Sequence, residues 1–269
     1  MYKIAIPSYR RSAILSNTTI PMLIAGGIKK IYLFIESSDL NNYIDQCDNL
    51  DIEIQYCLTE ARGIGNVRNY VRDYFDIGTK VIMIDDDITG VYQRDEQIID
   101  LNSFIKEAFE NCISVGSTLW GVQLFQNQFF LRDGITTKLT YINGSFTGFI
   151  KTKDEIYVDI DHFEDYLFSI LHFLRDGVLC KFTDVWLKTK PFLQVGGICQ
   201  QANGLEARKQ QALVNGERLY NLFPEAVILK HSKKYDIQNI RLNHHCKWSS
   251  ELANSAGLYL SNLENNDNW

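Results

Sequence analysis

The chain has 269 residues, of which 45% are hydrophobic and 22% charged, a composition typical of folded globular proteins that excludes an intrinsically disordered chain. The formal net charge of −6 argues against a protein covered in positive charge. No apolar segment approaches the roughly 20 residues that a membrane helix needs, so we expect no membrane partner. The six cysteines form no CxxC pair, which favours a reduced, cytoplasmic setting.

The first half of the chain alternates apolar strands with helical patterns. Four segments are predicted to be strands: 2–7, 30–36, 52–58 and 81–84. The last is wholly apolar, so we expect it to be buried on both faces. Helices are predicted over 16–25, ended by Gly26-Gly27, and around 67–75, where apolar residues recur at helical spacing. This alternation predicts an α/β fold in which helices flank a mostly parallel, Rossmann-like sheet and ligands bind beyond the carboxyl ends of the strands.

The second half has a more mixed pattern. Residues 119–131 interleave aromatic residues with Gln and Asn, which suggests strands near a polar site. Asp161 is predicted to cap a helix that ends at Gly177. A strand, a helix and a short strand are predicted over 181–186, 205–220 and 226–229. No repeat or linker divides the chain, so we predict one domain over 1–269.

Three carboxylates directly follow the buried fourth strand: Asp85, Asp86 and Asp87. Adjacent like charges beside a core need a counter-charge, and a divalent cation with carboxylate ligands supplies one. In an extended segment Asp85 and Asp87 point to one face and Asp86 to the other. We therefore expect the metal on Asp85 and Asp87, with Asp86 contacting a sugar or ribose hydroxyl. The alternative is a solvated turn rich in Asp.

Two segments of the first half are predicted to bind a nucleotide. Gly63 permits close backbone approach at a helix start, where Arg62 and Arg68 add positive charge for phosphate. The loop Pro7-Ser8-Tyr9-Arg10 follows the first strand, and there Tyr9 could stack on a base and Arg10 could meet phosphate. Glu36, which ends the second predicted strand, is included with them. The alternatives are an ordinary helix cap and a surface loop with solvated arginines.

Candidate residues in the second half are less distinctive. Glu164 and Asp165 lie at the start of an apolar helix, where they either complement the helix dipole or provide a general base for a hydroxyl group. His231 could be a third metal ligand and Lys234 a phosphate contact, although an isolated histidine is more often structural. Residues 181–247 contain eleven Lys and Arg against five Asp and Glu, a balance of +6. This segment either faces an anionic acceptor such as nucleic acid or is a solvated surface.

Taken together, these elements resemble the glycosyltransferases of the GT-A fold. The first strand ends in a Pro-Ser-Tyr loop, and a Gly/Arg-Asn helix start over 62–69 precedes a DxD element, here 85–87. The resemblance spans about residues 1–235 and implies that Glu164 or Asp165 is the base and that His231 joins the metal. We expect the single domain to comprise a nucleotide-sugar-binding half (1–118), an acceptor-binding half (119–260) and a polar tail (261–269).

Within that fold the chain looks most like the family associated with TET/J-binding-protein dioxygenases, found in phages and in base-J-forming protozoa. The opening IPSYRR, the triple Asp, Gly196-Gly197 and Arg208 carry this resemblance. It implies a UDP-sugar donor such as UDP-glucose, Mg2+ or Mn2+, and a DNA acceptor with a flipped-out hydroxymethylated pyrimidine. A polysaccharide, lipid or protein acceptor, a sugar-phosphate nucleotidyltransferase and a catalytically silent nucleotide- or DNA-binding module are the alternatives.

Overall fold

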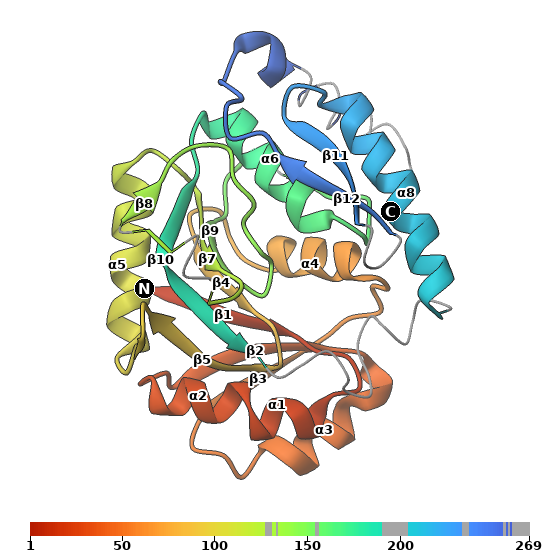
Figure 1. Ribbon diagram of the computed structural model, residues 1–269. Helices are drawn as coiled ribbons and strands as arrows, with labels where there is room; N and C mark the ends of the chain where they lie inside the picture. The colour runs from red at the N-terminus through yellow and green to blue at the C-terminus, as the bar shows by residue number, and fades with distance from the viewer. Residues whose placement is uncertain are drawn as a thin grey trace.

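A ten-stranded sheet with the order β3-β2-β1-β4-β9-β7-β10-β5-β6, and with β8 paired to β10, forms the centre of the computed structural model (Figure 1). The structure describes residues 1–126, 131–132, 134–153, 156–189, 204–232 and 237–254, together with Gly257 and Tyr259. The strands are β1 (Tyr2–Pro7), β2 (Lys30–Ile35), β3 (Glu53–Leu58), β4 (Lys80–Ile84), β5 (Ile88–Gln93), β6 (Glu96–Gln97), β7 (Leu119–Gln123), β8 (Ile135–Thr136), β9 (Phe146–Ile150) and β10 (Cys180–Thr189). A separate antiparallel pair consists of β11 (Val227–Ser232) and β12 (Ile237–Leu242).

Strand direction confirms the predicted mostly parallel sheet. Strands β1 to β4 pair in parallel, and β7 is parallel to β10. Strands β5, β8 and β9 run against these six, and β6 runs with them. The parallel part therefore brings the carboxyl ends of β1 to β4 to one edge.

Helices cover both faces of this sheet (Figure 1). They are α1 (Ser12–Asn17), α2 (Thr19–Ala25), α3 (Leu40–Cys47), α4 (Ile64–Asp73), α5 (Leu101–Ser114), α6 (Glu164–Asp176) and α8 (Gly204–Leu222), with a 3-10 turn, η1, at Ser37–Asp39. On β4, Val81 and Met83 pack into the core beneath α4 and α6, whereas Ile82 and Ile84 pack into the core beneath α1, α2 and α5. All four are buried, as predicted for a strand covered on both sides. No helix in the described part of the chain has the length and apolar character needed to cross a membrane.

The predicted helix over 16–25 is wrong as a single element, because the chain breaks between α1 and α2 at Thr18. The Thr18 hydroxyl donates to the carbonyl oxygens of Ile14 (2.6 Å) and Asp86 (2.8 Å). The Thr19 hydroxyl donates to the Asp85 carbonyl (3.0 Å) and accepts from the Ile88 N–H (3.0 Å). The hydroxyls of these two threonines thus hold the backbone of the acidic segment in place.

Asp161 does not cap the following helix, which is a second correction. Helix α6 begins after Phe163, whose backbone is left-handed (φ 70°). The Asp161 carboxylate instead accepts a hydrogen bond from the Gly65 N–H, at 3.0 Å, in the first turn of α4. A side chain distant in sequence therefore caps α4, an arrangement that local spacing does not reveal.

Candidate functional site

A cavity with a volume of about 580 Å3 lies at the carboxyl edge of the parallel strands. Parallel strands β1 to β4 end there, which is where open α/β sheets bind ligands. All the described residues predicted to bind the nucleotide line it: Pro7, Ser8, Tyr9, Arg10, Glu36, Arg62, Gly63, Arg68, Asp85 and Asp86. Asp87 and Arg11 also line it. The fold therefore gathers residues from four separate loops around one volume.

Within this cavity the Asp86 carboxylate is held by the protein. It accepts hydrogen bonds from the Ser8 hydroxyl (2.5 Å) and from the Arg11 guanidinium (3.1 Å), and Asp86 is 5% exposed. The Tyr43 hydroxyl lies 2.6 Å from the Ser8 oxygen and extends this network into the core. Asp86 thus organises the loop after β1, and its predicted contact with a donor hydroxyl stays a prediction.

Asp85 and Asp87 are the more accessible members of the acidic segment, with side chains 30% and 25% exposed. Burial, followed by the charges of Asp85 and Asp86, raises the pKa of Asp87 to about 6. Such crowding favours a bound cation, and carboxylate oxygens are the ligands that Mg2+ and Mn2+ prefer. No group of three metal-ligating side chains occurs among the described residues, so phosphate and water oxygens would complete the shell. The carboxylates of Asp85 and Asp87 therefore have the chemistry that fits a divalent cation.

Arg11, rather than Arg10, contacts the acidic segment. The Arg11 guanidinium lies 3.1 Å from Asp86 and 3.4 Å from Asp87. Arg10 is exposed, has a positive φ of 53°, and its guanidinium lies 5.0 Å from the centre of the Tyr9 ring. The sequence places two arginines side by side, and only the entry into α1 decides which one turns inward.

Glu36 follows β2 and contributes a carboxylate to the cavity wall. Its Oε2 atom is buried and has no hydrogen-bond partner among the described residues. An acceptor of this kind normally finds a donor, because an unsatisfied buried oxygen costs about 1–3 kcal/mol. Ribose, sugar and base groups all provide such donors.

Arg68 joins the acidic segment to the predicted base. Its guanidinium lies 3.4 Å from Asp85 through Nη2 and donates to Glu164 through Nη1. Arg68 is 6% exposed, and a Cβ added to Gly144 would overlap its guanidinium, so glycine at 144 makes room for it. Arg68 therefore acts first as a buried ion-pair partner, a role that the predicted phosphate contact did not anticipate.

Asp165 is fixed by a tyrosine. The Tyr141 hydroxyl donates to Asp165 at 2.5 Å and accepts from the Asn143 amide at 2.7 Å. The Tyr141 ring stacks on Tyr166 with centroids 4.0 Å apart. Burial raises the pKa of Asp165, and burial together with the Asp165 charge raises the pKa of Glu164 to about 8. Neither carboxyl lines this cavity; Glu164 is buried, whereas Asp165 is partly exposed. Its raised pKa means that Glu164 retains a proton near neutral pH.

Gly63 lines the cavity, but the start of α4 already has an anionic partner. Gly63 has a φ of 82°, and a Cβ added there would overlap the Asp161 carboxylate. A Cβ added at Gly65 would overlap the Ile160 carbonyl oxygen. These glycines thus permit close packing of α4 against residues 160–161. Phosphate contacts of Gly63 and Arg62 stay predictions, with the exposed Arg62 side chain at the rim.

Neither of the two remaining predicted ligands is among the described residues that line the cavity. His231 lies on β11, in the smaller sheet, and does not line the cavity. Lys234 lies outside the described residues, as do Gly196 and Gly197. The metal-ligand role of His231 and the phosphate role of Lys234 therefore stay predictions.

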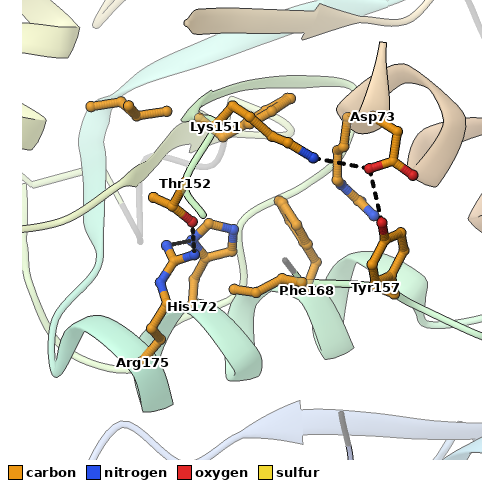
Figure 2. A pocket seen from close by; sticks show the side chains of 11 residues that line it. Asp73, Lys151, Thr152, Tyr157, Phe168, His172 and Arg175 are labelled. Atoms are coloured by element: carbon orange, nitrogen blue, oxygen red, sulfur yellow. Dashed lines mark hydrogen bonds and ion pairs between the residues drawn. The ribbon is translucent and has the colours of Figure 1, made fainter. Parts of the chain in front are cut away.

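A second polar cluster, between α4, β9 and α6, encloses only about 20 Å3 (Figure 2). Asp73 accepts from Lys151 (2.9 Å) and from Tyr157 (3.0 Å), and Arg175 donates to His172 (2.9 Å). Burial lowers the pKa of His172 to about 3, so its ring is neutral at physiological pH. A space of this size has room for a water molecule but not for a substrate, so we interpret the cluster as structural packing.

Comparison with known proteins supports the fold. No protein-family model and no curated protein matches the chain. Mannosyltransferase PcManGT from Pyrobaculum calidifontis, solved with GDP-Man and Mn2+, is similar with a TM-score of 0.53 and 12% identity, over 82% of this chain and 64% of that chain. The fold is of the GT-A type.

Two further solved structures are more distantly similar. A fragment of S. aureus TarS matches with a TM-score of 0.48 and 13% identity, over 82% of this chain and 65% of that chain. The glycosyltransferase GlyE of Streptococcus pneumoniae matches with a TM-score of 0.44 and 9% identity, over 75% of this chain and 60% of that chain. The chain thus spans less than two thirds of the length of each of these three proteins.

Proposed function

We propose that this chain is a metal-dependent glycosyltransferase that moves a sugar from a nucleotide-sugar donor to a hydroxyl acceptor. The observation that carries the proposal is the pair of partly exposed carboxylates, Asp85 and Asp87, at the carboxyl edge of a parallel sheet. Its fold is shared with a mannosyltransferase solved with GDP-Man and Mn2+, which supports this assignment.

The chain's own residues divide the work of donor binding. Asp85 and Asp87 would hold Mn2+ or Mg2+, which neutralises the charge growing on the departing diphosphate when it is bound. Arg11 and Ser8 keep Asp86 in place, so that the segment is ordered before the donor arrives. The buried Glu36 oxygen accepts a hydrogen bond from a donor hydroxyl or N–H.

Transfer proceeds by direct displacement at the anomeric carbon. The acceptor oxygen forms a bond to that carbon while the bond to the diphosphate oxygen breaks, and the acceptor proton passes to the partly exposed Asp165, or to Glu164 in its ionised form. Tyr141 orients the Asp165 carboxylate for this role. A raised pKa makes Asp165 a stronger base than an exposed aspartate. The anomeric configuration inverts in this scheme, and NMR analysis of the product decides between inversion and retention.

The finer proposal is that UDP-glucose is the donor and that DNA carrying a hydroxymethylated pyrimidine is the acceptor. The resemblance to the TET/J-binding-protein-associated family and the +6 balance of residues 181–247 support it. A screen of nucleotide sugars against hydroxymethylcytosine DNA and hydroxymethyluracil DNA, read by nucleoside mass spectrometry, tests both parts. Glucosylation of a polysaccharide, lipid or protein, with no change in either DNA, would replace the DNA acceptor and keep the enzyme class.

Donor turnover tests the enzyme class itself. Purified protein with Mn2+ is expected to release UDP from UDP-glucose, and Asp165→Asn to reduce release about 100-fold, as loss of a general base does. Asp45→Asn, which changes an exposed carboxylate on α3, serves as the matched control and should turn over normally. Release of pyrophosphate from UTP and a sugar 1-phosphate would instead identify a nucleotidyltransferase. Donor binding without any turnover would identify a silent binding module.

A further inference from the structure

A second large cavity lies at the opposite edge of the sheet from the acidic segment. Its volume is about 580 Å3, and it is bounded by the beginnings of β1, β2 and β4 and by α5. Strand β1 rises about 3.3 Å per residue, so roughly 16 Å separates the two edges. Five lysines line the cavity: Lys3, Lys29, Lys30, Lys80 and Lys106. Glu110 is the one carboxylate among the described lining residues. This density of positive charge contrasts with the net charge of −6 of the whole chain.

Much of this charge is not neutralised by the protein. Lys29 and Lys30 form exposed ion pairs with Asp51 (3.6 Å) and Glu53 (2.7 Å). For Lys3, Lys80 and Lys106, by contrast, no carboxylate of the described residues lies within ion-pair distance. The cavity therefore holds three ammonium groups outside any ion pair, with Glu110 as the one carboxylate among its described lining residues.

Aromatic walls position two of these lysines. The Lys3 ammonium donates to the Tyr32 hydroxyl at 3.1 Å, and the Lys80 ammonium lies 5.6 Å from the centre of the Phe109 ring. Tyr32 and Phe109 are 8% and 1% exposed, so these rings support the lysine stems and are not free to stack on a base. Tyr2 also lines the cavity and is half-buried, and its hydroxyl donates to Asn102 at 2.7 Å. The cavity thus offers several lysine ammonium groups and no fully exposed aromatic ring among its described lining residues.

We propose that this lysine cavity binds a small polyphosphorylated ligand, of the diphosphate or triphosphate class, at a site separate from the nucleotide-sugar cavity. Lysine ammonium groups bind phosphate as point charges, and a multiply charged anion offsets their mutual repulsion. The volume lies within the range of small-molecule sites. An extended nucleic acid fits less well, because single-stranded binders combine backbone charge with exposed aromatic platforms. The site does not depend on the proposed transferase activity.

Lysine footprinting locates the ligand directly. The full chain is acetylated with an N-hydroxysuccinimide ester, with and without inorganic tripolyphosphate, in EDTA and at constant ionic strength. Peptide mass spectrometry then gives the acetylation rate of each lysine. We expect about tenfold slower acetylation at Lys3, Lys80 and Lys106 once the ligand occupies about 90% of the sites, and no change at the exposed Lys138. Equal slowing at Lys138, or no slowing at all, would overturn the proposal.

Variants provide the second arm. Lys3→Gln combined with Lys80→Gln is expected to weaken tripolyphosphate binding about tenfold by calorimetry and to remove the protection of Lys106. Lys138→Gln is the matched control and should bind as the wild type does. If circular dichroism shows that the double variant does not fold, Lys106→Gln replaces it, because Lys106 is exposed on α5. Lys106→Gln is expected to weaken tripolyphosphate binding about threefold. Unaltered binding in the folded variants, or protection by a single-stranded oligonucleotide but not by tripolyphosphate, would contradict a small-ligand site.

Discussion

The Arg68 guanidinium joins the acidic segment to the predicted base, and replacing Arg68 by Met removes that charge while it keeps an unbranched stem. Arg68 and Glu164 are 6% and 8% exposed, so the Glu164 carboxylate would lose its partner in a site that water barely reaches. Removal of one member of a buried ion pair costs about 3–5 kcal/mol. Because the pKa of Glu164 is about 8, we expect the free energy of unfolding of Arg68→Met to fall by about that amount above pH 8, where the wild-type pair is ionised.

Urea unfolding followed by far-UV circular dichroism measures this loss. The double variant Arg68→Met, Glu164→Gln should recover about 1–2 kcal/mol, because no buried charge is left unpaired. Lys30→Met, which breaks the exposed pair with Glu53, is the matched control and should lose far less. An Arg68→Met loss that is equally small, or that is unchanged when residue 164 is Gln, would refute the ion-pair reasoning.

The same variant has a defined pH dependence. In the native state burial raises the pKa of Glu164 from 4.5 to about 8, and loss of Arg68 removes an interaction that lowers it. At pH values between 4.5 and about 8, native Glu164 holds a proton that the unfolded chain has released, so the free energy of unfolding falls as pH rises. Arg68→Met should therefore lose more stability at pH 8 than at pH 5, and equal losses would contradict this assignment.

Two further substitutions test the surroundings of the proposed base. Tyr141→Phe removes a hydrogen bond that lowers the pKa of Asp165. The acidic limb of the pH–rate profile should therefore move to higher pH, and turnover at pH 7 should fall about tenfold. An unmoved pH–rate profile would count against the positioning role of Tyr141. Gly144→Ala forces a Cβ into the Arg68 guanidinium and should destabilise the protein by about 1–3 kcal/mol in urea unfolding. A Cβ at Gly257 meets no atom of the described residues within 4 Å, so Gly257→Ala is the matched control, and equal losses in the two variants would dismiss the steric account.

Sequence patterns predicted the elements that depend on local physical rules. Strand β1 begins and ends as expected, and β4 is buried on both faces over residues 81–84, which are all apolar. The acidic segment could be predicted because three adjacent carboxylates beside a buried strand repel one another unless a counter-charge lies close to them. Helix α3 and strand β9 were missed, since their short apolar segments are not distinctive by period or length.

The contacts inside the site depend on residues that are distant in sequence. Aspartate is a residue type that caps helices, but Asp161 caps α4 rather than the helix that follows it. It accepts from the N–H of Gly65, 96 positions earlier in the chain. Arg68 and Glu164 are also separated by 96 positions, and no local pattern predicts their pairing. The choice of Arg11 over Arg10 follows from a backbone turn, which residue type alone cannot specify.

Binding of Mn2+ in the presence of UDP, followed by the electron paramagnetic resonance signal of free Mn2+, tests the central claim most directly. The wild type and Asp45→Asn should bind Mn2+, and Asp85→Asn and Asp87→Asn should weaken binding at least about tenfold. Because the pKa of Asp87 is raised to about 6, protonation should compete with the metal below that pH and weaken binding about tenfold for each further unit. Equal binding by Asp85→Asn, Asp87→Asn and the wild type would contradict a cation held by these two carboxylates.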